Sequence, residues 1–480
     1  MKTRWIFLFW GIWQVAYSQL WQIHDFDFTD SLKKDTFHVR DTFNMPSGIV
    51  YFSSPSHSKA LIAKGIQWQK TWKKSRLIFE PYLVFQSAYS RPFYLHENVV
   101  PGGGIVLDKK NIFLLRPVFT WETKWNKYVR GGFSYGHEHF GTGYRSFLPS
   151  RHAPLYPSGF LNFLLRRFQY SYRLAYWNQK DSSIYYNKFT AMQFIRWDAL
   201  KWLTLTFFES ATWVPSKNTH MHAIELAYMQ PFAFLRPIDY SLGSPANMFM
   251  SGGIETRCGE YSCYAQLVLD EFYISEYKNE LRHLLHPKDT TILTGAWVNK
   301  QALQAGLKTY SFFGIDRLGF LFETNIARPY IYSHVFPEMS YSHQNQPVAH
   351  PLGANFFENI IWMGYSWRKN DLVLGGLWAE IGMDEDSIHM GQNILLSTFN
   401  GYRGNNIPVP TYGNKIAQGN KITLWTMYIT WTRSLIFYNI PIKFFLSFGF
   451  RKNTFIDQKI HPLFSLGFLQ NIKQPDLLNF

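Results

Sequence analysis

Apolar and polar residues alternate along many short stretches of this chain. The clearest stretch is 425–432, where Trp425, Met427, Ile429 and Trp431 alternate with Thr426, Tyr428, Thr430 and Thr432. Similar runs lie at 113–124, 203–207, 303–308, 442–450 and 464–468. A period of two places successive side chains on opposite faces of a strand. The pattern therefore predicts β-strands that have one apolar face and one polar face.

The chemistry of the two faces favours a membrane barrel. The apolar faces are large and aromatic, whereas the opposite faces carry mainly Thr, Gln, Lys and Gly. A strand that crosses a bilayer needs an apolar face toward the lipid, and a closed sheet pairs every backbone group. We therefore expect an all-β fold, an antiparallel transmembrane β-barrel of the bacterial outer membrane. The length predicts about 18 strands, within a range of roughly 16 to 20.

The two ends of the chain agree with export to that membrane. Lys2 and Arg4 precede a short apolar run at 5–15, and small residues follow at 16–18. This order is typical of a cleaved signal peptide, because the apolar run is shorter than the ~20 residues that span a bilayer. The chain ends on Phe480 after a last alternating run.

The organisation that we predict has three parts. Residues 1–18 are a signal peptide, 19–58 a periplasmic N-terminal segment or a plug, and 59–480 the barrel. Two long stretches without periodicity, Leu235–Gly253 and Pro329–Gly353, are expected to be loops. A loop as long as the second one is usually functional or folded into a lumen, so we expect loops to obstruct the barrel.

Composition and charge limit the classes of molecule that we expect this protein to bind. Aromatic residues make up 19 % of the chain, which suits the aromatic girdles of a barrel. The formal net charge is +15, and loss of Lys2 and Arg4 with the signal leaves +13. In this location a basic surface attracts lipopolysaccharide and acidic surface polysaccharide rather than nucleic acid. Dispersed Lys and Arg at the interfaces are the alternative explanation. Other outer-membrane proteins are further candidate partners.

Two cysteines lie close together, Cys258 and Cys263. Four residues separate them, and Gly259 suits the tip of a hairpin. Because the compartment is oxidising, we expect a disulfide between them.

Polar and aromatic residues gather in two segments. The candidate ligand-binding residues are Tyr144, Arg145, Arg328, Tyr330, His334, His343, Asn345 and His350. Their aromatic, amide and imidazole groups suit a carbohydrate and suit a folded plug equally well. The spacing of the three histidines matches no compact metal motif, so neither a metal nor a cofactor is expected.

Carboxylates recur in or beside the predicted strands. They are Glu209, Asp270, Glu271, Glu323 and Glu358. We expect them to lie in the lumen, where Arg145 and Arg328 would pair with carboxylates. Paired carboxylates can also cleave glycosides. However, buried ion pairs are the commoner use of such residues, and no serine has a recognisable nucleophile context. The sequence therefore predicts a protein that is not an enzyme.

Several motifs together resemble a known family. They are Gly-Thr-Gly-Tyr-Arg-Ser (141–146), Gln-Leu-Val-Leu-Asp-Glu-Phe (266–272), Asn-Lys (299–300) with Gln304 and Gly306, Arg-Pro-Tyr (328–330), and the His- and Asn-rich run at 341–355. The chain resembles the barrel family of the gliding-motility-associated protein RemB, which is similar in turn to the Wzi capsule-assembly family. The resemblance covers roughly residues 60 to 480. It implies about eighteen strands and a non-enzymatic function.

The function predicted on this basis is attachment or assembly of capsular or exopolysaccharide at the cell surface. Two alternatives stay open. One is a component of gliding motility or secretion that acts through protein partners. The other is a porin or transporter, which would need a passage through the lumen.

Overall fold

The computed structural model describes most of the chain. The described residues are 42–44, 47–54, 57–86, 112–181, 184–215, 225, 227–243, 246–271, 274–289, 291–385, 387–399, 408–437, 440–455 and 458–470. The predicted signal peptide, residues 1–18, lies outside them.

Strands dominate the described chain. They are β1 (Thr42–Asn44), β2 (Ser47–Ser54), β3 (His57–Gly65), β4 (Gln67–Thr71), β5 (Ser75–Gln86), β6 (Ile112–Lys124), β7 (Val129–Gly136), β8 (Tyr156–Leu164), β9 (Phe168–Asp181), β10 (Ile184–Leu200), β11 (Leu203–Trp213), β12 (Asn247–Cys258), β13 (Tyr261–Glu271), β14 (Lys300–Thr309), β15 (Leu318–Ala327), β16 (Ser342–His343), β17 (Gln346–Pro347), β18 (Phe356–Trp367), β19 (Asn370–Met383), β20 (Asn420–Phe437), β21 (Ile440–Asn453) and β22 (Ile460–Gln470). Two α-helices, α2 (Leu235–Leu242) and α3 (Ile274–Leu285), and two 3₁₀ turns, η3 (Phe312–Gly314) and η4 (Pro337–Met339), complete the described elements.

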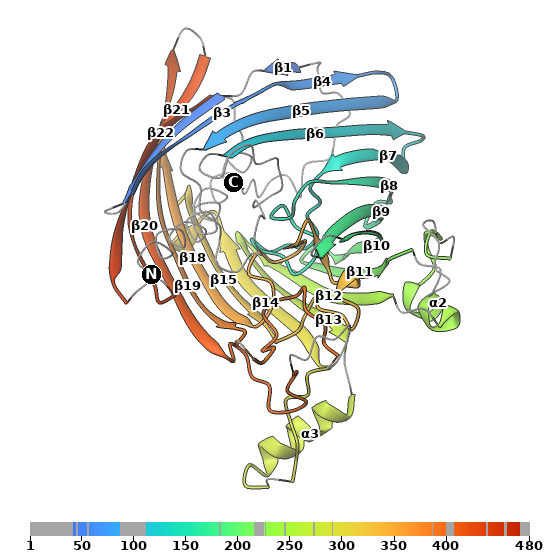
Figure 1. Cartoon of the computed structure of the whole chain (residues 1–480). Coiled ribbons are helices and arrows are strands. Elements are labelled where there is room, and N and C mark those ends of the chain that lie inside the picture. The colour runs from blue at the N-terminus through green and yellow to red at the C-terminus, as the bar shows by residue number, and fades with distance from the viewer. Residues whose placement is uncertain are drawn as a thin grey trace.

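The main sheet is antiparallel, and its pairing returns to its start (Figure 1). From β5 to β22 each main-sheet strand pairs with the next one along the chain. The ladder then runs from β22 to β2, from β2 to β3 and from β3 back to β5. The sheet has 20 described strands. Because β1 with β2 and β3 with β4 are consecutive pieces of single strands, the described residues form eighteen barrel strands, in agreement with the prediction of about 18.

The outer face of this barrel is apolar. Large exposed side chains recur there from strand to strand, among them Trp121, Phe133, Ile254, Leu303, Ile361, Met427 and Phe448. Trp72, Trp125 and Trp202 are exposed at the short turns of one end, as in the aromatic girdle at a membrane interface. A continuous apolar band on a closed barrel is unfavourable in water and stable in lipid. The protein is therefore a bacterial outer-membrane β-barrel.

Among the described residues, no helix is long and apolar enough to cross a membrane.

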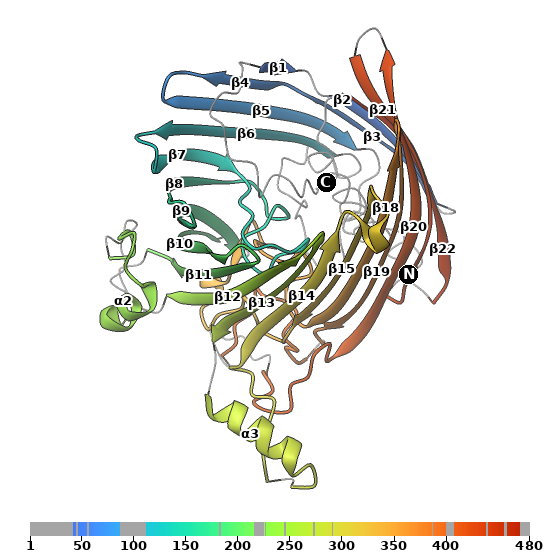
Figure 2. The same cartoon turned by 180° about the vertical axis from the view of Figure 1, so that it is seen from behind.

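The two ends of the barrel differ in their connections. Short turns follow β6, β8, β10, β12 and β18, whereas long connections follow β7, β11, β13, β15 and β19 at the opposite end. Residues 137–155, after β7, and 328–355, after β15, fold back into the barrel and are here called the inner loops (Figure 2). Buried side chains of the inner loops, such as Phe147 and Tyr332, form one cluster with inward-facing strand residues, such as Phe208 and Val268.

One long connection packs against the outer face of the barrel wall instead of the inner face. The described residues 227–243 after β11, here called the outer segment, include α2 and lie against the outside of the wall (Figure 1). Tyr228 and Leu235 of this segment form a second buried cluster with Tyr170, Trp213 and Met248 of the strands. The long connections therefore cover both faces of the wall.

Two details differ from the expectations drawn from the sequence. The strands β1 and β2 fall within residues 19–58, so the barrel begins earlier than residue 59. The predicted disulfide is absent, because Cys258 and Cys263 are both free. The register explains this result, since Cys258 lies opposite Tyr261 and Cys263 opposite Thr256. Such diagonal neighbours are about 7–8 Å apart, which is too far for a disulfide.

Candidate functional site

The carboxylate of Glu323 anchors the first inner loop. Glu323 points inward from β15 and is fully buried. It accepts hydrogen bonds from the backbone N–H groups of Tyr144 at 2.6 Å and Arg145 at 2.9 Å, and from the Tyr264 hydroxyl at 2.6 Å. Gly143 permits this close approach, because a Cβ there would lie 2.2 Å from Oε1 of Gln304. Glu323 therefore holds the loop against the wall.

Arg145 is buried in the same place. Its Nη2 lies 3.5 Å from Oε1 of Glu358, and its Nη1 lies 3.1 Å from Nε2 of His152. Both Arg145 and Glu358 are completely buried. Arg145 thus points into the lumen and pairs with a carboxylate, but solvent does not reach the pair. The interaction joins the loop to β18 and leaves little room for a ligand.

His350 of the second inner loop completes this cluster. Its Nε2 lies 3.0 Å from Oε2 of Glu358, while Nδ1 accepts the N–H of Leu352 at 3.2 Å. The proton is therefore assigned to Nε2, which donates to Glu358. Burial lowers the pKa of His350, although the neighbouring carboxylate opposes this effect. The ring also stacks on Phe147 at 5.2 Å between centroids, so the two inner loops contact each other.

The other candidate ligand-binding residues of the second inner loop bind backbone groups. Tyr330 donates its hydroxyl to the carbonyl of His389 at 2.7 Å. Nδ1 of His334 accepts the N–H of Phe336 at 3.1 Å, and Nδ1 of His343 accepts the N–H of Asn178 at 3.0 Å. The amide of Asn345 pairs with both backbone groups of Lys180. Burial lowers the pKa of His334 and of His343 to about 4, so both rings are neutral at pH 7.

The remaining carboxylates divide between two faces of the wall. Asp270 faces inward and accepts the N–H of Tyr332 at 2.8 Å, while Glu271 lies 3.2 Å from Nζ of Lys300. Glu209 does not lie in the lumen, which corrects the expectation for this residue. It lies on the outward face of β11, where it accepts the N–H groups of Leu235 at 3.0 Å and Arg236 at 2.7 Å.

Two further residues organise the loops and were missed by the sequence reasoning. Asp384 accepts the N–H groups of Met390 at 2.6 Å and Gly391 at 2.9 Å, and contacts Nδ1 of His389 at 3.0 Å. Burial alone would raise the pKa of Asp384, but these hydrogen bonds hold it below its ordinary value. Lys188 is buried and donates to the carbonyl of Ser340 at 2.6 Å. Neither residue belongs to a motif, so no local signal could have singled it out.

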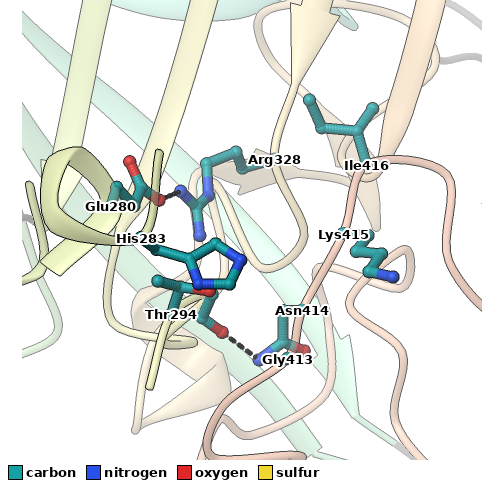
Figure 3. Close-up of a pocket in the computed structure, with 9 residues that line it drawn as sticks. Glu280, His283, Thr294, Arg328, Gly413, Asn414, Lys415 and Ile416 are labelled. Atoms are coloured by element: carbon teal, nitrogen blue, oxygen red, sulfur yellow. Dashed lines mark hydrogen bonds and ion pairs between the residues drawn. The ribbon is translucent and has the colours of Figure 1, made fainter. Parts of the chain in front are cut away.

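An accessible cavity lies beside Arg328 (Figure 3). Its lining comes from the long connections after β13, β15 and β19, so it lies at that end of the barrel. It has a volume of about 340 Å³ and is lined by Glu280, His283, Thr294, Gly295, Arg328, Gly413, Asn414, Lys415 and Ile416. Nη1 of Arg328 contacts Oε1 of Glu280 on α3 at 2.9 Å, so Arg328 pairs with a carboxylate at the loop end of the barrel.

The backbone fixes the opposite side of this cavity. The N–H of Gly413 donates to the carbonyl of Thr294 at 2.8 Å, and that of Asn414 donates to the carbonyl of Gly295 at 3.0 Å. Three basic side chains, Arg328, His283 and Lys415, stand against the single carboxylate of Glu280. The cavity can therefore hold a small polar or anionic molecule by hydrogen bonds. No cluster of three metal-ligating side chains occurs among the described residues.

Comparisons with known proteins point away from the resemblance that the sequence suggested. No family model matches the chain, and no curated protein matches it. Solved structures do match. OccK5 (OpdH) of Pseudomonas aeruginosa has a TM-score of 0.48 and 6 % identity, over 90 % of this chain and 98 % of that one.

Two other Pseudomonas aeruginosa structures are similar to the chain in the same way. The outer membrane protein opdK has a TM-score of 0.47 and 8 % identity, over 90 % of this chain and 98 % of that one. OprD has a TM-score of 0.43 and 6 % identity, over 90 % of this chain and 96 % of that one. These neighbours are OccK, opdK and OprD structures and not Wzi or RemB proteins. The predicted membership of the Wzi- and RemB-like family, and the polysaccharide-attachment function that it implied, are therefore wrong.

Proposed function

We propose that this protein is a non-enzymatic outer-membrane porin or transporter that carries small solutes. The observation that carries the proposal is a closed ring of eighteen strands with a polar inner face. Barrels of roughly 16 to 18 strands enclose more space than their own wall side chains fill, so such a ring leaves a channel unless something else occupies it.

The inner loops occupy part of that space and make the passage selective. They fill the side of the lumen next to β13, β15 and β18, where Asp270, Glu323 and Glu358 hold them. A loop that is anchored by buried hydrogen bonds narrows the channel permanently, because opening it would leave those groups without partners. The proposed passage is therefore narrow and specific in shape, unlike a wide diffusion pore.

Charged side chains line the inner face of the opposite wall. Arg76 of β5 lies 3.2 Å from Glu122 of β6, and Arg130 of β7 lies 4.0 Å from the same carboxylate. Two arginines therefore lie beside one glutamate on this face of the wall. In a low-dielectric channel, arginine side chains attract anions and raise their local concentration.

The cavity beside Arg328 lies at the end from which a solute would arrive, if the long connections face outward as in other outer-membrane barrels. Its basic side chains suit a carboxylate or phosphate group. An enzymatic function has less support, since the inward carboxylates of Glu323 and Asp270 are already bound to backbone amides.

Conductance tests the proposal directly. The full-length protein, refolded and inserted into planar lipid bilayers, should give small, discrete conductance steps and a reversal potential that favours anions. Liposome swelling with neutral and anionic solutes of equal size should show faster uptake of the anionic ones. Folded protein that produces neither conductance nor uptake would overturn the proposal. The matched control is the double variant Arg76→Gln with Arg130→Gln, which should lose the preference for anions and keep the conductance.

A further inference from the structure

The outer wall of the barrel carries a carboxylate where lipid should be. Glu209 lies between Phe207 and Ala211 on the outward face of β11. Its neighbours Phe208 and Ser210 face inward. The Phe208 ring lies 5.5 Å from that of Phe140 between centroids, and Ser210 contacts the Tyr341 hydroxyl. Glu209 nevertheless has an exposed fraction of only 1 %. The outer segment covers it.

The height of Glu209 on the wall is fixed by the register. β11 begins at Leu203, beside the exposed Trp202 at the short-turn end. Six residues at ~3.3 Å each, on a strand tilted by ~40°, place Glu209 roughly 15 Å above that end. The apolar band of an outer-membrane barrel is ~25 Å tall. Glu209 is therefore level with the acyl chains and not with the water outside.

At this height the outer segment forms hydrogen bonds with several polar side chains of the wall. The first turn of α2 donates two N–H groups to Glu209. Gln193, which lies opposite Glu209 on β10, donates its amide to the carbonyl of Ala233 at 2.7 Å. Tyr172 donates its hydroxyl to the carbonyl of Tyr228 at 2.9 Å. Each of these wall groups would be costly in contact with hydrocarbon.

The exposed surface of the segment carries large aromatic side chains. Phe232 and Phe234 are each 63 % exposed, and Tyr240 is 90 % exposed. Leu235, by contrast, points to the wall and is fully buried. The segment thus buries polar contacts and exposes large aromatic groups, together with Arg236, whose charge acts on Glu209.

We propose that the outer segment is embedded in the membrane, where it covers the polar patch around Glu209 and binds the acyl chains of outer-membrane lipid through Phe232, Phe234 and Tyr240. The surface continues the lipid-facing band of the strands, which is already an interface with acyl chains. Lipid is therefore the occupant that the position and the chemistry both favour. This proposal rests on the location in the outer membrane and not on solute transport.

The geometry of the segment is rigid enough for this role. Phe232 has a positive φ of 82°, a conformation that bulky residues rarely adopt. Its N–H donates to the Tyr170 hydroxyl at 2.9 Å, and its ring stacks on Tyr170 at 4.9 Å and meets Phe163 at 4.8 Å. A strained residue persists only where its surroundings hold it. The segment is therefore a fixed part of the wall.

Spin labelling tests this proposal with a direct readout. Tyr240→Cys is made in a background in which Cys258 and Cys263 are replaced by Ser, and the label is attached in the full-length protein refolded in liposomes. Collision rates with oxygen, which concentrates in lipid, and with a water-soluble nickel complex are then measured. Ile254→Cys, on the outer face of β12, is the lipid-exposed control. Tyr185→Cys is the control in water. Tyr185 lies at the start of β10, at the end of the barrel that carries the long connections, and its side chain is 66 % exposed.

The outcomes are distinct. High oxygen and low nickel accessibility at position 240, within about twofold of the values at position 254, would support the proposal. Nickel accessibility equal to that at position 185 would overturn it, since the segment would then lie in water. Low accessibility to both reagents would also overturn it, because another protein surface would then cover the segment. All three labelled proteins carry changes at exposed sites, and heat-modifiable migration in gels verifies that each barrel is folded.

Discussion

The inner loops and the outer segment are held by the same device on opposite faces of one wall. Inside, Glu323 accepts the N–H groups of two consecutive residues, Tyr144 and Arg145. Outside, Glu209 accepts those of Leu235 and Arg236. In each case a strand supplies a carboxylate and a long connection supplies a pair of backbone donors. The position of the carboxylate in the alternation of the strand decides the face on which the connection lies.

The two regions differ in what surrounds that contact. Inside, further charges and hydrogen-bonding groups gather, including Arg145, His350 and Glu358. Outside, aromatic rings such as Tyr170 and Trp213 enclose it. Inner loops can therefore respond to charge and pH, whereas the outer segment depends mainly on apolar packing. This difference generates four predictions.

The largest effect is expected from Arg145→Met. The substitution removes one partner of a fully buried ion pair and leaves the Glu358 carboxylate with His350 and the amide of Asn325. Loss of one member of a buried pair costs about 3–5 kcal/mol. We expect the free energy of unfolding in liposomes to fall by that amount, and the conductance in planar bilayers to rise as the loop leaves the wall. Unchanged values for both would show that the pair does not hold the loop.

The next effect is expected from Glu323→Gln. The amide oxygen can still accept one hydrogen bond, but the charge that strengthens the bonds to two N–H groups is lost, which costs about 2–3 kcal/mol. Conductance should rise by less than in Arg145→Met. Glu380→Gln is the matched control, since its ion pair with Lys421 is partly exposed and contributes little. An equal loss of stability in both variants would contradict this prediction.

A smaller effect is expected from Glu209→Gln on the outside. The N-terminus of α2 loses its negative partner, and the cost is about 1–2 kcal/mol. Because the site lies outside the lumen, single-channel conductance should not change. The outer segment should instead become more sensitive to protease added to liposomes. A change in conductance without increased proteolysis would show that Glu209 acts on the lumen and not on the outer segment, which would contradict this prediction.

The smallest effect on stability is expected from a drop in pH. Burial lowers the pKa of His334 and of His343 to about 4, from about 6.5 in the unfolded chain. The unfolded state therefore binds more protons below pH 6.5, and stability should fall as the pH drops from 6.5 toward 4. Residues 227–243 contain no histidine, so acid should loosen the inner loops before the outer segment.

Hydrogen exchange at pH 7 and at pH 4.5 measures this order. Amides of 328–355 should lose protection at the lower pH, while those of 227–243 keep it. His343→Gln, which retains a hydrogen-bonding group without a titrating ring, should reduce the pH dependence. Loss of protection in both regions together would show that acid acts on the whole barrel.

The family resemblance illustrates the limit of local motifs. The segments at 141–146 and 341–355 suggested a Wzi- or RemB-like protein. The first inner loop, which contains 141–146, packs against 341–355 inside the barrel. Ser150 donates to the carbonyl of Ala349 at 2.6 Å, and Phe147 stacks on His350. Their tyrosine, histidine and asparagine groups form the hydrogen bonds that hold the inner loops in place. The same residues looked suitable for binding sugar because the donors of a plug and of a sugar site have the same chemistry.

The sequence by itself determined the class of fold, because a period of two is a local property of each strand. The alternation at 203–207, continued by two residues, places Glu209 on the apolar face with Leu205 and Phe207, although Glu209 was expected in the lumen. The side on which each long connection folds was decided only by the tertiary structure. That choice depends on donors and acceptors that are far apart in the chain, such as Tyr144 with Glu323 or Lys188 with Ser340. Period and composition carry no information about such pairs, since each partner alone is an ordinary polar residue.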